Sequence, residues 1–282
     1  MVRLASIAVA ALVLVAAGHA AHAAERVQFE SARYQVGPLQ RRLALQRHQP
    51  ILQPPPSIID GFLTRPEGPG PFPAVVHLHG CGGLPDDVKR GANALWSDRL
   101  AAWGYVTLVV DSFTTRGINN TCSGELAQRV ADAYGALAYL ARQPFVDANR
   151  IAVIGFSAGG IAALSIAQAH DFELFDGVGE HTFKAAVAYY PACTPGNAMK
   201  MPTLVLIGER DDWSRAAACR GIDAPQHNGS PVKLVIYPGA YHSFDLPRPG
   251  RRYFGHWLEY NAAADEAAAQ ETKLFLAQHL RR

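Results

Sequence analysis

Short runs of consecutive apolar residues recur along most of the chain, separated by stretches whose apolar positions follow a helical pattern. The apolar runs cover residues 59–64, 73–79, 105–110, 151–154, 185–189, 203–207 and 232–237. The helical stretches cover residues 88–103, 125–142 and 157–170, and a long amphipathic one covers residues 257–280. Strands buried on both faces read as continuous apolar runs, so this alternation predicts a doubly wound, mostly parallel α/β sheet. No fixed-period repeat or linker divides the region, and we expect residues 57–282 to form a single domain.

The first 56 residues have a different pattern. A positive start at Arg3, an apolar run over residues 4–17 and the sequence Ala21-His22-Ala23 are typical of a signal peptide. We therefore expect residues 1–23 to be removed and the mature chain to be periplasmic or secreted. The alternative is a retained membrane anchor, for which the run is short, because a spanning helix takes roughly 20 apolar residues. Residues 24–56 read as a leader in which only an edge strand is recognisable.

Composition narrows the classes of function. The chain is 49% hydrophobic and 18% charged, and its formal net charge of +2 is too small to favour nucleic acid or an anionic membrane surface as a partner. The four cysteines, Cys81, Cys122, Cys193 and Cys219, include no C-x-x-C pair, which argues against a zinc knuckle or a thioredoxin-type site. In an exported chain an even number of cysteines favours disulfides. The sequence favours no particular oligomeric state.

The segment Gly155-Phe156-Ser157-Ala158-Gly159 matches the pattern G-x-S-x-G. An expected strand precedes it and an expected helix follows it. In that context the motif forms a sharp turn that lifts the serine hydroxyl clear of the backbone, and the helix start directs N–H groups toward the site. Ser157 is therefore the predicted nucleophile.

A serine nucleophile needs a base, and the base needs a carboxylate that orients it. In this type of site the chain order is serine, acid, histidine. His242 follows the last expected strand, at the edge where open α/β sheets place their sites, and is the predicted base. Asp211 and Asp212 both follow the strand at 203–207. Adjacent residues cannot both face the histidine, and we favour Asp211 over Asp212.

The oxyanion that forms during acyl transfer needs two N–H donors. Ala158, directly after the nucleophile, is expected to supply one. The glycine-rich loop at residues 79–83 is expected to supply the other, with Cys81 favoured over Gly80 and Gly82.

Two other readings of this loop are less favoured. Cys81 could serve as a nucleophile, but a disulfide or packing role fits it better. His77 and His79 share one strand face and resemble half of a metal site. Neither H-x-H-x-D-H nor H-E-x-x-H occurs, so we predict no metal.

With these pieces in order, the chain resembles the dienelactone hydrolase family of α/β-hydrolases. The matching segments are HGCGG (79–83), GYVTLVVDSF (104–113), GFSAGG (155–160), GERDDW (208–213) and YHSF (241–244). The resemblance implies the α/β-hydrolase fold, no cofactor and hydrolysis of small esters or lactones. The nucleophile of the family is often cysteine, and Ser157 is closer to its esterase branch.

Three further residues are candidates for substrate contacts. Family members that open anionic dienelactones hold the substrate carboxylate with arginines. Arg116, in a strand-end loop, either points into the site in this way or is solvated. Trp213 and Phe244 stand beside the acid and the base and are either pocket walls or core side chains. Only residues 191–202 lie where related enzymes often insert a helical lid, so we expect no lid domain and an open site.

The expected fold also leads us to prefer two cysteine pairings, Cys81–Cys122 and Cys193–Cys219, among the three that four cysteines allow. The leading hypothesis is an exported serine hydrolase that cleaves small carboxylic esters or lactones through an acyl-enzyme. One alternative is a serine peptidase on the same fold, although the chain has no room for a large gating domain. The other is a non-catalytic binding protein, which would not need the complete Ser-Asp-His set.

Overall fold

The computed structural model of the protein describes residues 24–280, apart from 51–54, 92–93, 125–127, 169–174, 177–179, 195, 197 and 226–228. The predicted signal peptide, residues 1–23, lies outside the described residues. The described part is built around an eight-stranded sheet with the strand order β1-β3-β5-β4-β6-β8-β9-β10.

Seven of the eight strands of this sheet follow the predicted apolar runs. The bounds of all eight are β1 (Glu25–Glu30), β3 (Ile58–Thr64), β4 (Phe72–Leu78), β5 (Val106–Asp111), β6 (Val146–Phe156), β8 (Ala186–Tyr189), β9 (Thr203–Gly208) and β10 (Val232–Tyr237). Pairing is parallel from β5 through β4, β6, β8 and β9 to β10. Only the β1–β3 and β3–β5 pairs are antiparallel in this sheet. The predicted mostly parallel α/β sheet is therefore confirmed.

The first strand lies within the segment that the sequence marked as a leader. β1 pairs with β3 along its whole length, from Glu25 opposite Leu63 to Glu30 opposite Ile58. These main-chain bonds make β1 the edge strand of the sheet. The fold therefore takes in the edge strand that precedes residue 57.

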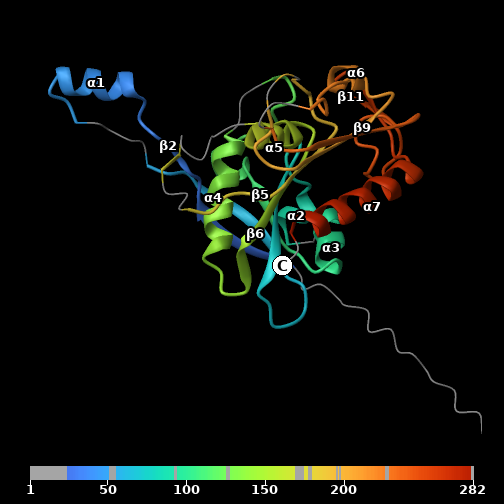
Figure 1. Ribbon diagram of the computed structural model, residues 1–282, viewed down its shortest axis with the longest axis horizontal. Coiled ribbons are helices and arrows are strands. Elements are labelled where there is room, and N and C mark those ends of the chain that lie inside the picture. The colour runs from blue at the N-terminus through green and yellow to red at the C-terminus, as the bar shows by residue number, and fades with distance from the viewer. Residues whose placement is uncertain are drawn as a thin grey trace, which may run out of the picture.

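Helices cover both faces of the sheet, apart from the first helix, which lies away from it (Figure 1). Their bounds are α1 (Pro38–Gln46), α2 (Asp86–Lys89), α3 (Leu95–Ala102), the 3₁₀ turn η1 (Thr114–Arg116), α4 (Arg129–Ala141), α5 (Ala158–Gln168), α6 (Ala216–Cys219) and α7 (Ala262–His279). α4 and α5 pack together against β6 on one face, whereas α3 and α7 lie on the other, against β5 and β9. Two small antiparallel pairs complete the fold, β2 (Arg33–Tyr34) with β7 (Phe175–Asp176) and β11 (Arg251–Tyr253) with β12 (His256–Leu258).

Two predicted helices have different bounds in the structure. The stretch at 88–103 is split into α2 and α3, because Gly91 adopts a φ of 100° and ends α2. The C-terminal helix begins at Ala262 instead of Trp257, because Trp257 lies in β12. Asn261 caps this helix, since its side chain accepts a hydrogen bond from the N–H of Ala264.

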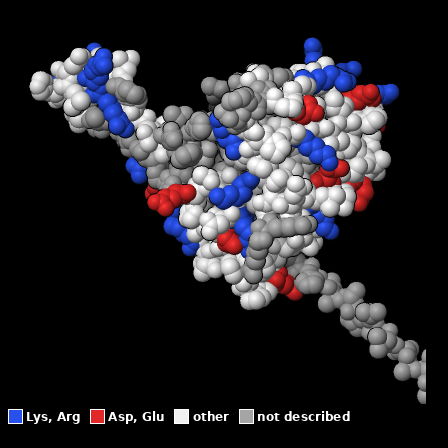
Figure 2. Space-filling model, in the orientation of Figure 1, with Lys and Arg blue, Asp and Glu red and all other residues white. Residues whose placement is uncertain are grey.

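Acidic and basic side chains are interspersed over the body of the molecule on the face that Figure 2 shows. This distribution matches the small formal charge of the chain. Among the described residues, no helix is long and apolar enough to cross a membrane.

Candidate active site

Ser157 lies at the turn between β6 and α5, with a φ of 52° in the left-handed region that side chains rarely adopt. The turn is tight on both sides. A Cβ on Gly155 would lie 2.0 Å from the carbonyl oxygen of Gly159, and one on Gly159 would lie 2.2 Å from that of Leu78. Glycine is therefore required at both motif positions. The close approach seats the start of α5 against the end of β4, where the loop at residues 79–83 begins.

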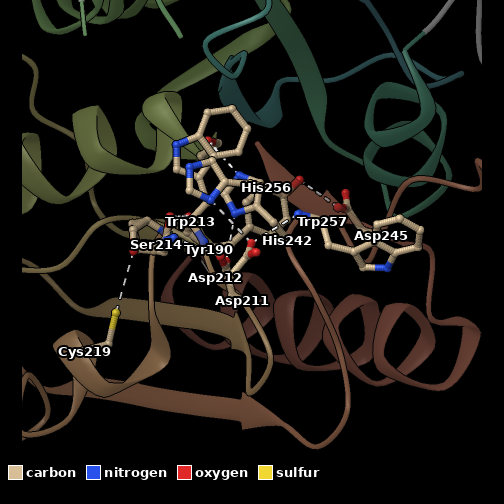
Figure 3. A network of polar contacts seen from close by, with 12 residues as sticks. Tyr190, Asp211, Asp212, Trp213, Ser214, Cys219, His242, Asp245, His256 and Trp257 are labelled. Atoms are coloured by element: carbon tan, nitrogen blue, oxygen red, sulfur yellow. Dashed lines mark hydrogen bonds and ion pairs between the residues drawn. The ribbon is translucent and has the colours of Figure 1, made fainter. Parts of the chain in front are cut away.

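His242 lies in the loop after β10 and bridges the two other residues of the predicted set. Its Nε2 is 3.0 Å from Oγ of Ser157, and its Nδ1 is 2.8 Å from Oδ2 of Asp211. An ionised carboxylate only accepts hydrogen bonds, so Nδ1–H donates to Asp211 and Nε2 accepts from the serine hydroxyl. The side chains of His242 and Asp211 are both buried, which shields their bond from water (Figure 3). This arrangement can remove a proton from a serine nucleophile.

The structure separates the two adjacent aspartates. Asp211 is buried, and its Oδ1 accepts the N–H groups of Trp213 at 2.9 Å and Ser214 at 2.8 Å. These bonds leave Oδ2 to face His242. Asp212 is exposed and contacts the β11–β12 hairpin, where its Oδ1 accepts the N–H of Trp257 at 3.2 Å. Of the two, Asp211 therefore has the geometry of an orienting acid.

Sequence reasoning missed a second buried carboxylate near His242. Asp245 accepts hydrogen bonds from the indole N–H of Trp96 at 2.9 Å and the phenol of Tyr190 at 2.7 Å. Burial raises the pKa of Asp245. The ring of Tyr190 lies 4.6 Å from that of His242, and the ring of Trp213 lies 5.1 Å from it on centroid distances. Asp245 thus fixes an aromatic neighbour of the imidazole instead of the imidazole itself.

A cavity of about 450 Å³ opens beside Ser157 and His242. One wall comes from the segment after the 79–83 loop and includes Leu84, Val88 and Leu95. The cavity has room for a small molecule.

A second part of the cavity lining comes from the β11–β12 hairpin, of which the sequence assigned only residues 257–258, to the terminal helix. Tyr253 and Leu258, from the β11–β12 hairpin, line the cavity. Trp213 stacks on His256 of the hairpin, with centroids 4.7 Å apart. At the other end, a Cβ on Gly82 would lie 3.2 Å from the Tyr253 hydroxyl. The hairpin therefore contacts both the Asp211 loop and the 79–83 loop. The sequence predicted an open site, and in the structure this hairpin forms part of the boundary of the cavity.

The predicted substrate-contact residues have three different outcomes in the structure. Trp213 lines the cavity. Phe244 is fully buried and packs on Tyr189, Tyr190 and Tyr237, so it is a core side chain and not a cavity wall.

Arg116 is held away from the cavity. Its guanidinium binds both carboxylate oxygens of the buried Asp132, at 2.7 and 2.8 Å, and donates to the carbonyl of Ser112. It is not among the residues that line the cavity. The expectation that Arg116 points into the site is therefore wrong, because a carboxylate on α4 engages the side chain.

The two predicted oxyanion donors lie at the start of α5 and in the 79–83 loop. Ala158 is the first residue of α5, and the first N–H groups of a helix have no partner within it. The 79–83 loop lines the cavity, and a Cβ on Gly80 would lie 3.6 Å from Cβ of Ser157. Both Ala158 and Cys81 are therefore placed beside the nucleophile.

His77 and His79 are both buried, and both ring nitrogens of His79 have hydrogen-bond partners within the fold. Burial lowers the pKa of His77 to about 3 and that of His79 to about 4, so both are neutral. The N–H of Ser112 donates to Nε2 of His79, which leaves Nδ1–H to donate to the carbonyl of Gly80 at 2.7 Å. Among the described residues, no group of three or more metal-ligating side chains occurs.

Both expected disulfides are present. Cys81–Cys122 ties the 79–83 loop to the segment before α4. Cys193–Cys219 ties the segment after Tyr190 to α6, which follows the Asp211 loop. The Cys81 sulfur is in a disulfide, so it has no thiol to act as a nucleophile.

Comparisons with known proteins identify the family of the chain. The sequence profile of the dienelactone hydrolase family matches residues 59–280. A probable 2-oxo-3-(5-oxofuran-2-ylidene)propanoate lactonase from Bradyrhizobium sp is 26% identical over 235 residues, which cover 78% of this chain and 89% of the lactonase. Esterase FrsA from Shigella boydii serotype 18 is 32% identical over 148 residues, or 51% of this chain. The match spans about a third of the length of that esterase.

Solved structures show the same fold. The crystal structure of P91, a dienelactone hydrolase-like promiscuous phosphotriesterase from metagenomic libraries, matches with a TM-score of 0.64 and 21% identity. The match covers 92% of this chain and 99% of P91. MGS-M1, an α/β-hydrolase enzyme from a deep-sea metagenome library of the Medee basin, matches with a TM-score of 0.56 and 17% identity, over 79% of this chain and 93% of MGS-M1.

Proposed function

Because the chain belongs to the dienelactone hydrolase family, we propose that it is a serine-dependent hydrolase of small carboxylic esters or lactones. The observation that carries this proposal is the position of His242, within hydrogen-bond reach of both Ser157 Oγ and Asp211 Oδ2. The esterase and lactonase relatives support the same class of bond.

In the proposed reaction, Oγ of Ser157 attacks the substrate carbonyl carbon while Nε2 of His242 takes the hydroxyl proton. Asp211 holds the imidazole in the required tautomer and stabilises the imidazolium that forms. The carbonyl oxygen becomes an oxyanion, which accepts hydrogen bonds from the N–H groups of Ala158 and Cys81. The C–O bond to the alcohol then breaks and His242 returns the proton to the leaving oxygen. In a lactone this alcohol stays attached to the acyl group.

Water completes the cycle. His242 takes a proton from a water molecule, whose oxygen attacks the acyl carbon on Ser157. A second oxyanion forms at the same donors, the bond to Oγ breaks, and the serine regains its proton. The products are the carboxylic acid and the alcohol, or the hydroxy acid from a lactone.

The cavity supports small substrates. Its volume of about 450 Å³ lies at the low end of pockets that hold small molecules. Leu84, Val88 and Leu95 offer one apolar wall for an acyl or alcohol group, and Trp213 offers an aromatic surface beside His242.

We also propose export. The predicted signal peptide at residues 1–23 supports it. So do the two disulfides, because disulfides form and persist in oxidising compartments.

The test is hydrolysis of p-nitrophenyl acetate and butyrate by the mature chain and its Ser157→Ala variant. Ser57→Ala is the matched control, because Ser57 directly precedes β3 and does not line the cavity. We expect turnover by the wild type and the control, and a loss of at least about a thousandfold in kcat for Ser157→Ala. Equal activity of Ser157→Ala and the wild type would exclude Ser157 as the nucleophile. Inactivity of all three toward both esters would exclude small activated esters and favour the peptidase and binding-protein alternatives.

A further inference from the structure

Arg129, the first residue of α4, is a buried cation outside the residues that carry the proposed reaction. It is 6% exposed. Burial lowers its pKa to about 10, so it remains charged at neutral pH. Within the described part of the chain it forms no ion pair at salt-bridge distance. Buried arginines are rare unless they are paired, because removing the charge from water is costly.

The contacts of Arg129 converge on the 79–83 loop. Its Nη2 donates to Oγ1 of Thr121 at 3.1 Å and to the carbonyl oxygen of Gly80 at 3.3 Å. Its guanidinium lies 4.8 Å from the ring centroid of Phe113, a favourable cation–π distance. The Gly80 carbonyl also accepts from Nδ1 of His79 and from the N–H of Gly83. Three donors therefore hold one carbonyl oxygen.

That carbonyl belongs to the same peptide group as the N–H of Cys81. In a trans peptide the C=O and N–H bonds point in opposite directions. When Arg129 and His79 draw the Gly80 oxygen toward α4, the Cys81 N–H is directed to the other side of the peptide. Gly80 and Cys81 both line the cavity, and the Gly80 backbone lies next to Ser157. The direction of the Cys81 N–H is thus determined by the groups behind the loop.

The rest of Cys81 is already fixed by other bonds. Its sulfur is tied to Cys122, and its carbonyl accepts the N–H of Thr121 at 2.8 Å. Rotation of the Gly80–Cys81 peptide is the freedom that these bonds leave, and glycine on one side makes that rotation easy.

We propose that Arg129 is a positioning residue for the oxyanion hole. It holds the Gly80–Cys81 peptide with its N–H toward Ser157. Its charge also polarises the hydrogen-bonded amide, which makes the N–H a stronger donor. The inference rests on the proposed function, because it needs an oxyanion at Ser157.

The test compares Arg129→Met with Arg116→Met, using kcat and KM for p-nitrophenyl butyrate, inhibition by an alkyl boronic acid, and thermal unfolding. Arg116 is a matched control, because it is an arginine near α4, partly buried, that binds Asp132 and Ser112 instead of the 79–83 loop. A boronic acid forms a tetrahedral adduct on serine and reports the hole directly. Loss of one oxyanion donor costs about 100- to 1000-fold in kcat, so we expect a decrease of about 10- to 100-fold for Arg129→Met, with KM within about twofold.

The inhibition constant of the boronic acid should rise in Arg129→Met by a similar factor to the loss in kcat. Arg116→Met should lower the unfolding temperature and leave kcat and boronate binding near wild type. If Arg129→Met does not fold, Arg129→Lys carries the test, with an expected decrease in kcat of about tenfold at constant KM.

Wild-type kcat and boronate affinity in a folded Arg129 variant would overturn the proposal. So would losses that equal those of Arg116→Met and follow the drop in unfolding temperature, since a merely structural role predicts them. These outcomes differ from failure of the proposed function, in which Ser157→Ala would retain wild-type activity. That result would overturn both proposals.

Discussion

The two sides of Ser157 are built in different ways. On the acid–base side, the bonds that hold the groups are the bonds that the proposed reaction uses, from Asp211 to His242 to Ser157. On the oxyanion side, the groups that would meet the substrate are backbone N–H groups. Their positions depend on residues behind the loop, including the Cys81–Cys122 disulfide and Arg129. A change on the first side should abolish catalysis abruptly, and a change on the second should weaken it by degrees.

The largest effect is expected from Asp211→Asn, because the amide would no longer hold His242 in the tautomer that accepts the serine proton. We expect kcat to fall by about 1000- to 10,000-fold with little change in unfolding temperature. Asp212→Asn is the matched control and should stay within about threefold of wild type, since Asp212 is exposed and binds the main chain of Trp257 instead of His242. Similar losses in both variants, measured on p-nitrophenyl butyrate, would contradict the division between the two aspartates.

Substitutions of Phe244 and Trp213 should have different effects, because Phe244 packs in the core and Trp213 lines the cavity. Phe244→Ala removes a fully buried ring and should lower the free energy of unfolding by about 3–5 kcal/mol. Trp213→Ala opens the cavity wall and should raise KM more than it lowers stability. Denaturant unfolding and steady-state kinetics on both variants test this pair. An unchanged KM in Trp213→Ala would show that Trp213 does not contact the substrate.

The disulfides allow the two sides to be compared directly. Replacing Cys81 and Cys122 together by serine should reduce stability and also lower kcat by about tenfold, because the oxyanion loop loses a tether. Replacing Cys193 and Cys219 together should cost about 2–4 kcal/mol of stability and leave kcat near wild type. Urea unfolding and kinetics below the transition give both quantities. If the two double variants lose the same fraction of kcat, the proposed difference between the two sides of Ser157 is wrong.

The smallest effect expected is a change in how stability depends on pH. It comes from His77, which lies in β4 just before the 79–83 loop. Burial lowers the pKa of His77 to about 3, against an ordinary value of 6.5. The unfolded chain therefore binds a proton below pH 6.5 while folded His77 stays neutral. Protonation of His77 in the unfolded chain therefore lowers the free energy of unfolding as the pH falls from 6.5 toward about 3, and it has no effect above pH 6.5.

We expect the free energy of unfolding of His77→Leu to fall less steeply with acid than that of the wild type. The difference in slope should be at most about 1.4 kcal/mol per pH unit. Urea titrations between pH 7 and pH 4.5 measure it. Parallel slopes for the two proteins would show that His77 keeps the same pKa in both states.

The acid–base side could be predicted from the sequence because its signals are local. The G-x-S-x-G turn is a strand–turn–helix unit whose glycines are required by contacts within a few ångströms. Asp211 and His242 follow recognisable strands, and parallel strands end at one edge of the sheet. Asp211 could also be favoured over Asp212 as the orienting acid, since adjacent side chains cannot both face the histidine.

The failures come from contacts between distant parts of the chain. Arg116 lies at a strand end, as the sequence indicated, but Asp132 on α4 determines its direction. Phe244 stands beside His242 in the sequence and points into the core. The β11–β12 hairpin was not predicted, and residues 257–258 of β12 were read as the start of the terminal helix. Arg129 reads as an ordinary first-turn residue, because no local pattern indicates that the start of α4 lies behind Gly80.

The most direct test of a serine nucleophile at position 157 is covalent trapping followed by peptide mass spectrometry. The mature protein would be incubated with a p-nitrophenyl alkylphosphonate, whose phosphorus is attacked by an activated serine with release of p-nitrophenol. We predict one phosphonyl group per chain, located on Ser157, with loss of esterase activity in proportion to labelling and no labelling of the Ser157→Ala variant. An adduct on another residue, or full esterase activity after complete labelling of Ser157, would contradict the account.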